Sequence, residues 1–312
     1  MEEDFVVKLA FVFPGQGSQS VGMMAGWGER PEVRATFEEA SGALGEDLWR
    51  LVAEGPAEVL NQTVNTQPAM LAADVAAWRV WQAAGGAAPA LLAGHSLGEY
   101  AALVAAGALS FSDAIRLVRF RAEAMQAAVP EGVGAMAAIL GLDDDTVRAV
   151  CAGAAAGEVV EAVNLNSPGQ VVIAGNKAAV ERAMALAKEK GAKRALPLPV
   201  SVPSHSSLMQ PAADRLLAHL QSVTVSTPAL PVLHNTDVQI HVEPEAIRIA
   251  LAKQLHTPVR WVETVQALKA AGVERVIECG PGKVLAGLGK RIDDSLPAVA
   301  LVDEASLAAA LN

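Results

Sequence analysis

Short apolar runs alternate with longer amphipathic stretches along most of the chain. The runs 8–13 and 90–93 have the length and apolar composition of buried strands, whereas the alanine-rich stretch 67–83 has the composition of a helix. Further strands are expected at 231–233, 276–278 and 298–301, and further helices at about 244–254, 262–271 and 283–291. This alternation predicts an α/β fold in which a mainly parallel sheet is flanked by helices on both faces.

The segment from Gly134 to Arg194 has a different order of elements. Strands are expected at 135–140, 159–165, 170–174 and 194–199, and helices at 143–154 and 177–190. The order β-α-β-β-α-β is that of a ferredoxin-like unit. We therefore expect residues 131–199 to form an inserted ferredoxin-like α+β subdomain that makes one wall of a cleft. Residues 1–130 and 200–312 are expected to form an α/β hydrolase-like catalytic core.

The pentapeptide Gly94-His95-Ser96-Leu97-Gly98 stands between the second apolar run and a predicted helix that begins at Glu99. A serine on a sharp turn from strand to helix is typical of a nucleophile elbow, in which the flanking glycines leave room for the strained turn. The helix N-terminus also favours a developing negative charge. The alternative is a turn with an ordinary capping serine, and the strand and helix around it favour the nucleophile.

A serine becomes a nucleophile near neutral pH only with a base within hydrogen-bonding distance. His205 stands in the small polar loop 200–207 just after the predicted insert, where a hinge would bring it to a cleft between two lobes. His95 adjoins Ser96, but consecutive side chains diverge on a sharp turn, so we interpret it as a structural partner. The acidic run 143–145 caps a helix of the insert, so a triad acid is missing and a backbone carbonyl could orient the histidine instead.

Two further patterns bear on ligand binding. The first apolar run leads directly into the glycine-rich loop 14–19, which should bring backbone N–H groups near a ligand but matches neither a dinucleotide fingerprint nor a P-loop. The stretch 113–129 predicts an amphipathic helix with Ser112 as its N-cap. Arg121 falls at the margin of the apolar stripe of this helix, and so at the edge of a buried region.

Composition excludes several classes of function. The chain has 312 residues, 52% of them hydrophobic, and its net charge of −10 argues against non-specific nucleic-acid binding. The acidic start 1–4 does not resemble a secretory signal, and charged residues interrupt the apolar stretches, so no membrane span is expected. Cys151 and Cys279 lie far apart and lack metal-ligand spacing, which predicts reduced thiols in a cytoplasmic protein and no metal site.

Two basic clusters are either solvated surface or a docking site for an acidic partner. One comprises Lys188, Lys190, Lys193 and Arg194, and the other comprises Lys283, Lys290 and Arg291. Charge alone does not decide between these interpretations.

Five motifs taken together resemble those of one family. In chain order they are 13–19 (FPGQGSQ), 94–99 (GHSLGE), 164–170 (NLNSPGQ), 202–205 (VPSH) and 278–282 (ECGPG). They resemble the motifs of malonyl-CoA:acyl-carrier-protein transacylases, and the resemblance extends over nearly the whole chain. Five motifs in register are far more specific than any one of them.

The resemblance implies a ping-pong transfer for fatty-acid chain elongation. Ser96 attacks the malonyl thioester, His205 accepts its proton, and the backbone N–H groups of Gln16 and Leu97 form the oxyanion hole. The backbone carbonyl of Gln254 orients His205, which explains the missing acid. The malonyl-Ser96 ester then passes its acyl group to the phosphopantetheine thiol of acyl carrier protein.

The resemblance also implies which residues recognise the substrate. Arg121 matches the arginine that binds the free malonyl carboxylate, since a planar guanidinium can hold a carboxylate by two parallel hydrogen bonds. Gln67, His95 and Asn166 match cleft-lining residues, with turn or packing roles as the alternative. Ser204, beside the histidine, resembles the bacterial fatty-acid type and favours malonyl over methylmalonyl groups.

No permanently bound cofactor is implied, because malonyl-CoA and the phosphopantetheine arm of the carrier protein are substrates. We expect a monomer without nucleic-acid or membrane partners. Three alternatives remain: a serine hydrolase or thioesterase, a discrete acyltransferase that serves a polyketide pathway, and a carrier-docking subunit without activity. A carboxylate-binding Arg121 argues against the first, and the intact Ser96 and His205 argue against the third.

Overall fold

The computed structural model describes residues 7–200 and 202–312, so the acidic start 1–4 lies outside the described residues. The larger of its two sheets contains β1 (Leu9–Phe13), β2 (Leu91–Gly94), β7 (Val232–Leu233), β8 (Arg275–Cys279) and β9 (Ala298–Leu301). These strands lie in the order β7-β2-β1-β8-β9, and every neighbouring pair is parallel. The predicted parallel sheet of an α/β core is thereby confirmed.

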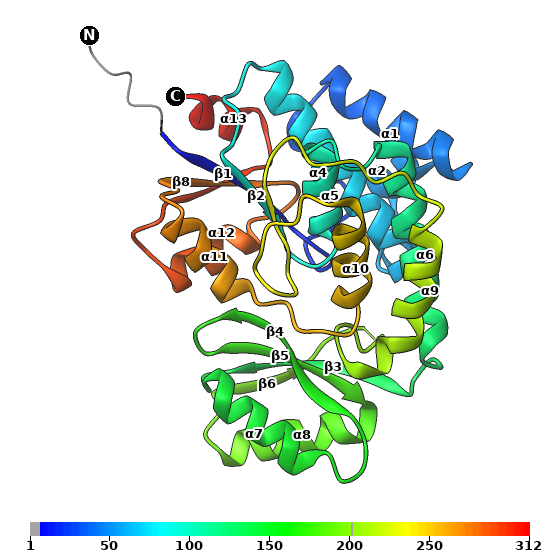
Figure 1. Ribbon diagram of the computed structural model, residues 1–312, viewed down its shortest axis with the longest axis vertical. Helices are drawn as coiled ribbons and strands as arrows, with labels where there is room; N and C mark the ends of the chain where they lie inside the picture. Colours follow the sequence, from blue (N-terminus) through cyan, green and yellow to red (C-terminus); the bar gives the residue numbers. More distant parts are fainter. Residues whose placement is uncertain (1–6, 201) are drawn as a thin grey trace.

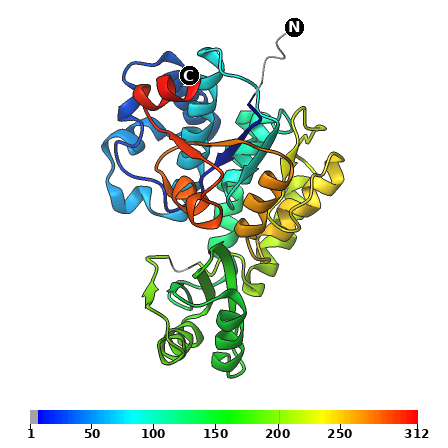
Figure 2. The same cartoon turned by 90° about the vertical axis from the view of Figure 1, so that its left-hand side faces the viewer.

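Two groups of helices pack on the two faces of this sheet (Figures 1 and 2). The first group comprises α1 (Pro31–Leu44), α2 (Leu48–Glu54), α3 (Ala57–Leu60), α4 (Thr63–Ala83), α5 (Gly98–Ala105), α6 (Phe111–Ala128), α9 (Gln210–Leu220), α10 (Pro244–Gln254) and α13 (Glu304–Leu311). The second comprises α11 (Trp261–Ala270) and α12 (Val284–Ile292). Along β1, Phe11 and Phe13 pack with the first group, whereas Ala10 and Val12 pack with the second. Alternate residues of a strand point to opposite faces, so a strand buried on both faces is apolar throughout.

The smaller sheet belongs to the predicted insert and lies below the core in Figure 1. Its elements are β3 (Gly134–Leu140), α7 (Asp144–Ala154), β4 (Val160–Ser167), β5 (Gln170–Asn176), α8 (Lys177–Glu189) and β6 (Arg194–Pro197). The strands pair antiparallel in the order β4-β5-β3-β6, with α7 and α8 packed on one face. The element order of a ferredoxin-like unit is confirmed, and the limits 131 and 199 stay a prediction.

Edge strand β4 of the small sheet is joined to the core. The Leu165 N–H donates to the Val259 carbonyl (3.0 Å), and the Val259 N–H donates to the Val163 carbonyl (2.9 Å). The Glu161 carboxylate of β4 accepts hydrogen bonds from the backbone N–H and the hydroxyl of Ser207 (2.7 and 2.9 Å). Ser207 lies two residues after His205, the expected base. These contacts pair an otherwise open sheet edge and fix the insert as a wall beside the core.

Helix α6 starts earlier than predicted. Its N-cap is Ser110 rather than Ser112, and the Ser110 hydroxyl oxygen accepts a hydrogen bond from the Asp113 N–H (3.2 Å). Ser112 lies inside the first turn, where its hydroxyl donates to Glu39 (3.1 Å). Both serines satisfy the sequence rule for a cap, and burial of Phe111 in the core favours the earlier start. Over 7–200 and 202–312, every helix is too short or too polar to cross a bilayer.

Candidate active site

Ser96 lies on the turn between β2 and α5 with a backbone φ of +52°, in the left-handed region that side chains disfavour. The two glycines around it have no room for a side chain. A Cβ on Gly94 would lie 2.0 Å from the Gly98 carbonyl carbon, and a Cβ on Gly98 would lie 2.0 Å from the Phe13 carbonyl oxygen. The strand, the turn and the helix therefore meet closely enough to force the strained conformation on the serine.

We expect Gly98→Ala to destabilise the fold by about 3 kcal/mol or more and to abolish acyl transfer, because β1 would have to move away from α5. The free energy of unfolding and the transfer rate would be measured together. Gly42→Ala on α1 is a matched control, since a Cβ there meets nothing within 4 Å. It should stabilise the helix by about 0.5–1 kcal/mol. Equal behaviour of the two variants would contradict the steric role of Gly98.

The structure brings His205 to Ser96. The Ser96 hydroxyl lies 2.8 Å from His205 Nε2, and His205 Nδ1 lies 2.7 Å from the Gln254 backbone carbonyl. Because a carbonyl only accepts, Nδ1 carries the proton and Nε2 is free to accept the serine proton. His205 also has a positive φ, +66°, and its N–H donates to the Leu255 carbonyl (2.9 Å), which fixes the loop against the end of α10.

The base is neutral over the physiological range. Burial of the ring and the nearby positive charge of Arg121 lower the pKa of His205 from 6.5 to about 3. We expect kcat/KM for acylation of Ser96 to stay constant from about pH 8 down to about pH 5, because the free base is unprotonated over that range. A substrate carboxylate bound by Arg121, as the motif resemblance implies, would offset the charge of the guanidinium, so the apparent pKa should be higher in kcat than in kcat/KM. Rapid-quench acylation rates check both profiles, and a kcat/KM that halves near pH 6.5 would contradict this electrostatic account.

Arg121 of α6 is deeper than the sequence predicted, with only 2% of its surface exposed. Its Nη1 donates to Gln67 Oε1 (2.7 Å), and its Nη2 donates to Gln254 Oε1 (2.9 Å) and approaches the Ser96 hydroxyl at 3.3 Å. Within the described ranges, no carboxylate forms an ion pair with this guanidinium. Burial lowers its pKa, but a guanidinium stays charged. A buried cation whose hydrogen bonds go to neutral oxygens beside a nucleophile can bind an anionic group of the substrate.

Two backbone N–H groups beside Ser96 are available to an oxyanion. In residues 7–200 and 202–312, the Leu97 and Gln16 amides donate to no protein acceptor. Leu97 precedes the first turn of α5, whose dipole favours negative charge, and Gln16 lies in the loop after β1. Both residues line the same cavity as Ser96, which is the arrangement an oxyanion hole requires.

The cavity at Ser96 has a volume of about 310 Å³ and lies between the core and the open face of the small sheet. Ser204 and Asn166 line it as expected, and so does His95, whose Nε2 lies 2.8 Å from Asn166 Oδ1. Burial lowers the pKa of His95, so this imidazole is neutral and joins the elbow to β4. Gln67 is not at the cavity surface. It is fully buried on α4 behind Arg121, and its amide oxygen accepts a hydrogen bond from the guanidinium.

A buried carboxylate, Glu99, lies one layer behind these groups, and no sequence pattern assigned it a role. It accepts hydrogen bonds from His234 Nδ1 (2.7 Å), the Asn235 backbone N–H (2.9 Å) and Gln254 Nε2 (2.9 Å). The opposite end of the same Gln254 amide accepts from Arg121. One neutral amide thus separates the carboxylate from the guanidinium, which balances the buried charge and leaves Arg121 open to a substrate. The available signals were its place as the last residue of the motif 94–99 and its position in the first turn of α5.

Asn235 braces the strained turn and was also missed. Its Oδ1 accepts from the Ser96 N–H (2.7 Å), and its Nδ2 donates to the Gly94 carbonyl (2.6 Å). The Gln254 side chain adds a bond to the Ser96 carbonyl (3.0 Å). Both backbone groups of the serine are therefore fixed from outside the elbow, by residues 139 and 158 positions away in the chain.

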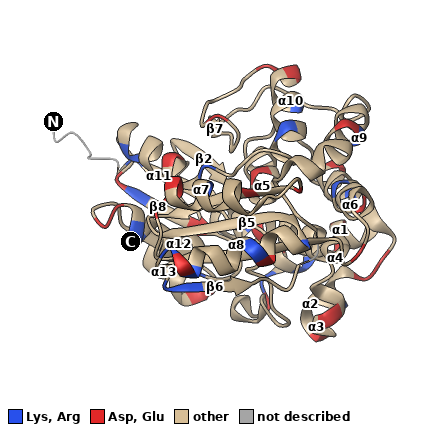
Figure 3. Cartoon of the chain, turned by 90° about the horizontal axis from the view of Figure 1, so that it is seen from below, with Lys and Arg blue, Asp and Glu red and all other residues tan. Residues whose placement is uncertain are grey.

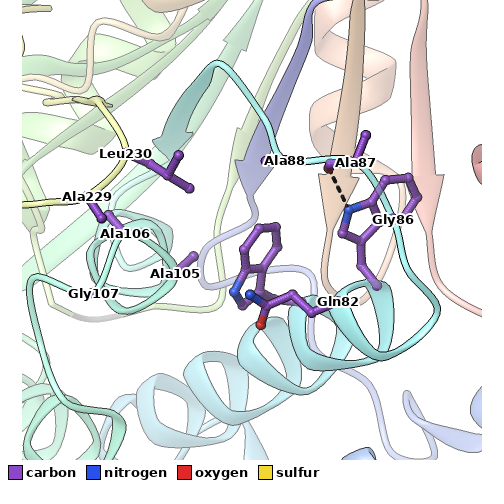
Figure 4. A pocket seen from close by; sticks show the side chains of 11 residues that line it. Gln82, Gly86, Ala87, Ala88, Ala105, Ala106, Gly107, Ala229 and Leu230 are labelled. Atoms are coloured by element: carbon purple, nitrogen blue, oxygen red, sulfur yellow. Dashed lines mark hydrogen bonds between the residues drawn. The ribbon is translucent and has the colours of Figure 1, made fainter. Parts of the chain in front are cut away.

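A second hollow, of about 410 Å³, lies at the other end of α4 and α5 (Figure 4). Trp78, Trp81 and small residues of 86–88 and 105–107 line it, and the Trp81 indole N–H donates to the Ala87 carbonyl (3.0 Å). None of its lining residues is titratable. This hollow therefore offers no acid, base or nucleophile of the kind found in the cavity beside Ser96.

Comparison with known proteins agrees with this geometry. The sequence profile described as "Acyl transferase domain" matches residues 10–308. The malonyl CoA-acyl carrier protein transacylase of Salmonella typhimurium is 59% identical over 308 residues, which is 98% of this chain and 100% of that protein. The Bacillus subtilis transacylase is 46% identical over 307 residues, 98% of this chain and 96% of that protein.

Solved structures show the same similarity. An acyl-carrier-protein S-malonyltransferase from Burkholderia pseudomallei superposes with a TM-score of 0.96 at 63% identity, covering 97% of this chain and 99% of that one. A malonyl-transacylase in complex with a type II polyketide acyl-carrier protein has a TM-score of 0.96 at 57% identity, with the same coverage. Because the family profile and these relatives match nearly the whole chain, the chain belongs to the acyl transferase family, among the malonyl CoA-acyl carrier protein transacylases.

Proposed function

We propose that this protein transfers the malonyl group of malonyl-CoA to the phosphopantetheine thiol of acyl carrier protein, through a malonyl ester on Ser96, and so supplies fatty-acid chain elongation. The observation that carries the proposal is the buried Arg121 guanidinium, which has no carboxylate partner in the described structure and lies 3.3 Å from the Ser96 hydroxyl. A free carboxylate on the acyl group supplies the missing anion. The names of the similar proteins support the same substrate.

In the first half-reaction, His205 Nε2 takes the Ser96 proton as the serine oxygen attacks the thioester carbonyl. The N–H groups of Gln16 and Leu97 bind the resulting oxyanion, a contribution of about 3 kcal/mol for each donor. Collapse of the intermediate breaks the carbon–sulfur bond, and the coenzyme A thiolate receives the proton from His205.

In the second half-reaction, the thiol of the carrier protein gives its proton to His205 and attacks the malonyl ester. The same oxyanion hole stabilises the second tetrahedral intermediate, and the ester oxygen leaves as the Ser96 hydroxyl with the proton from His205. The Gln254 carbonyl keeps the His205 ring in place through both steps, since it accepts from Nδ1 whether or not Nε2 is protonated. The enzyme returns to its starting state without a cofactor of its own.

The carrier protein would have to dock near the cavity mouth. One of the two basic clusters has Lys188 on α8 and Arg194 on β6, and Figure 3 shows Lys and Arg positions on both elements. In the other cluster, Arg291 on α12 donates to Gln170 (2.6 Å), a residue that lines the cavity. A docking role for these clusters stays a prediction.

Two buried free thiols, Cys151 and Cys279, support a cytoplasmic location. Burial raises the pKa of the Cys151 thiol to about 12.

The proposal is tested by incubating the protein with malonyl-CoA and then with holo carrier protein, and following the intact mass of both proteins. We expect malonyl on Ser96 first and on the carrier afterwards, with apo carrier protein, which lacks the arm, left unlabelled. Free malonate without carrier labelling would instead identify a thioesterase. The similarity to a transacylase that serves a polyketide carrier keeps that pathway as the second candidate. Relative transfer rates to fatty-acid and polyketide carriers decide between the two.

A further inference from the structure

The loop that carries Gln16 is tied to the junction between α3 and α4 at two points. The Thr63 hydroxyl donates to Gln16 Oε1 (3.0 Å), and Gln19 Nε2 donates to Asn61 Oδ1 (2.9 Å). Gln16 itself is exposed and has Gly15 and Gly17 on either side, with Gly17 at a φ of +109°. The backbone of this loop is therefore held in place by side-chain contacts more than by regular structure.

The charge of Arg121 fixes the direction of the hydrogen bond between Gln67 and Thr63. Arg121 can only donate, so Gln67 must present its oxygen to the guanidinium (2.7 Å) and its Nε2 to the Thr63 hydroxyl (3.2 Å). The hydroxyl oxygen accepts that bond, and its one proton is left for Gln16 Oε1. The charge of Arg121 thus orients Gln67, and the bond from Gln67 leaves the Thr63 hydroxyl proton for the Gln16 side chain.

The two halves of the oxyanion hole are held very differently. Leu97 is buried, and its N–H is fixed by the elbow and by α5. The N–H of Gln16 depends on the exposed loop, where the Thr63 bond acts on the same residue that supplies the donor. Thr63 is itself 7% exposed at the first position of α4, so its hydroxyl is fixed in the core.

We propose that Thr63 is a positioning residue, which acts through its hydrogen bond to the Gln16 side chain to hold the Gln16 N–H in the oxyanion hole. This inference rests on the proposed function and adds a residue to it. Because the oxyanion forms with any acyl group, Thr63 should affect the chemical step for malonyl and acetyl substrates alike. That separates its role from the role of Arg121, which concerns malonyl alone.

The test compares Thr63→Val, which keeps the shape and loses the hydroxyl, with Thr63→Ser, which keeps the hydroxyl. We expect Thr63→Val to lower the rate constant of Ser96 acylation about tenfold, with little change in KM and by a similar factor for malonyl-CoA and acetyl-CoA. Thr63→Ser should recover most of that loss. The melting temperature of both variants is measured alongside, so that a folding defect is separated from a catalytic one.

A double-variant cycle tests the route of the effect. Gln16→Met removes the acceptor of the Thr63 bond and keeps the backbone N–H, so Thr63→Val should cost little further rate in that background. Full additivity, an unchanged rate in Thr63→Val, or a loss confined to malonyl-CoA would each overturn the inference. If the unmodified protein accepts no malonyl group at all, the proposed function fails with it. If the unmodified protein accepts malonyl and Thr63→Val behaves like it, only this inference fails.

Discussion

Ser96→Ala is expected to take up no malonyl group from malonyl-CoA and to lose transfer to the carrier protein by about a thousandfold or more. The variant keeps the backbone bonds of the elbow to Asn235 and Gln254, so the cavity should stay intact. Intact-mass spectrometry of the protein after rapid mixing is the measurement. The unmodified protein should gain one malonyl group, and peptide mapping should place it on residue 96.

His205→Ala is the companion variant, because the serine at 2.8 Å then has no base. It should acylate slowly and lose most of its transfer rate, while Ser96→Ala shows no ester at all. A malonyl label that survives in Ser96→Ala would place the ester on another residue and contradict the dyad.

Arg121→Ala is expected to lower kcat/KM for malonyl-CoA about a hundredfold, because about 3 kcal/mol is lost when one partner of a buried, hydrogen-bonded charge pair is removed. Transfer of acetyl groups should fall far less, so the preference for malonyl over acetyl shrinks or reverses. Acylation rates with the two coenzyme A thioesters are measured separately on the same preparation. Retained acetyl transfer is the internal control that the Ser96–His205 pair is intact.

Arg121→Lys is a matched variant that keeps the charge and loses the planar fork. Lysine cannot donate to Gln67 and Gln254 and also hold a carboxylate by two parallel bonds, so this variant should lie between the unmodified protein and Arg121→Ala. A malonyl preference that is unchanged in Arg121→Ala would show that the carboxylate binds elsewhere.

The sequence predicts the fold well where its signals are local. Apolar runs bounded by turn residues predicted the strands, and the alternation of these strands with helices predicted a parallel sheet. The elbow was predictable because steric rules fix both of its glycines. The difference between Ser110 and Ser112 as the cap of α6 was not, since both residues suit that position and only the burial of Phe111 separates them.

The site is less predictable because it joins distant segments. The motif resemblance suggested Gln254 for its backbone carbonyl, but nothing along the chain indicates that its side chain joins Arg121, Glu99 and the Ser96 carbonyl. The role of Asn235 was equally unpredictable, because an asparagine after a short strand is typical of an ordinary turn. A hydrogen bond between residues more than 100 positions apart leaves no periodicity in a single sequence. Only the packed structure shows that these amides support the strained serine and the buried cation.

We propose that Arg121 restricts Ser96 to an acyl group with a free carboxylate. The most direct measurement mixes the unmodified protein with equal concentrations of malonyl-CoA and acetyl-CoA and determines by mass spectrometry which group Ser96 carries at early times. We expect the unmodified protein to carry malonyl-Ser96 almost alone, and Arg121→Ala to carry acetyl-Ser96 in a comparable or larger share. Equal malonyl and acetyl labelling of the unmodified protein would contradict this proposal.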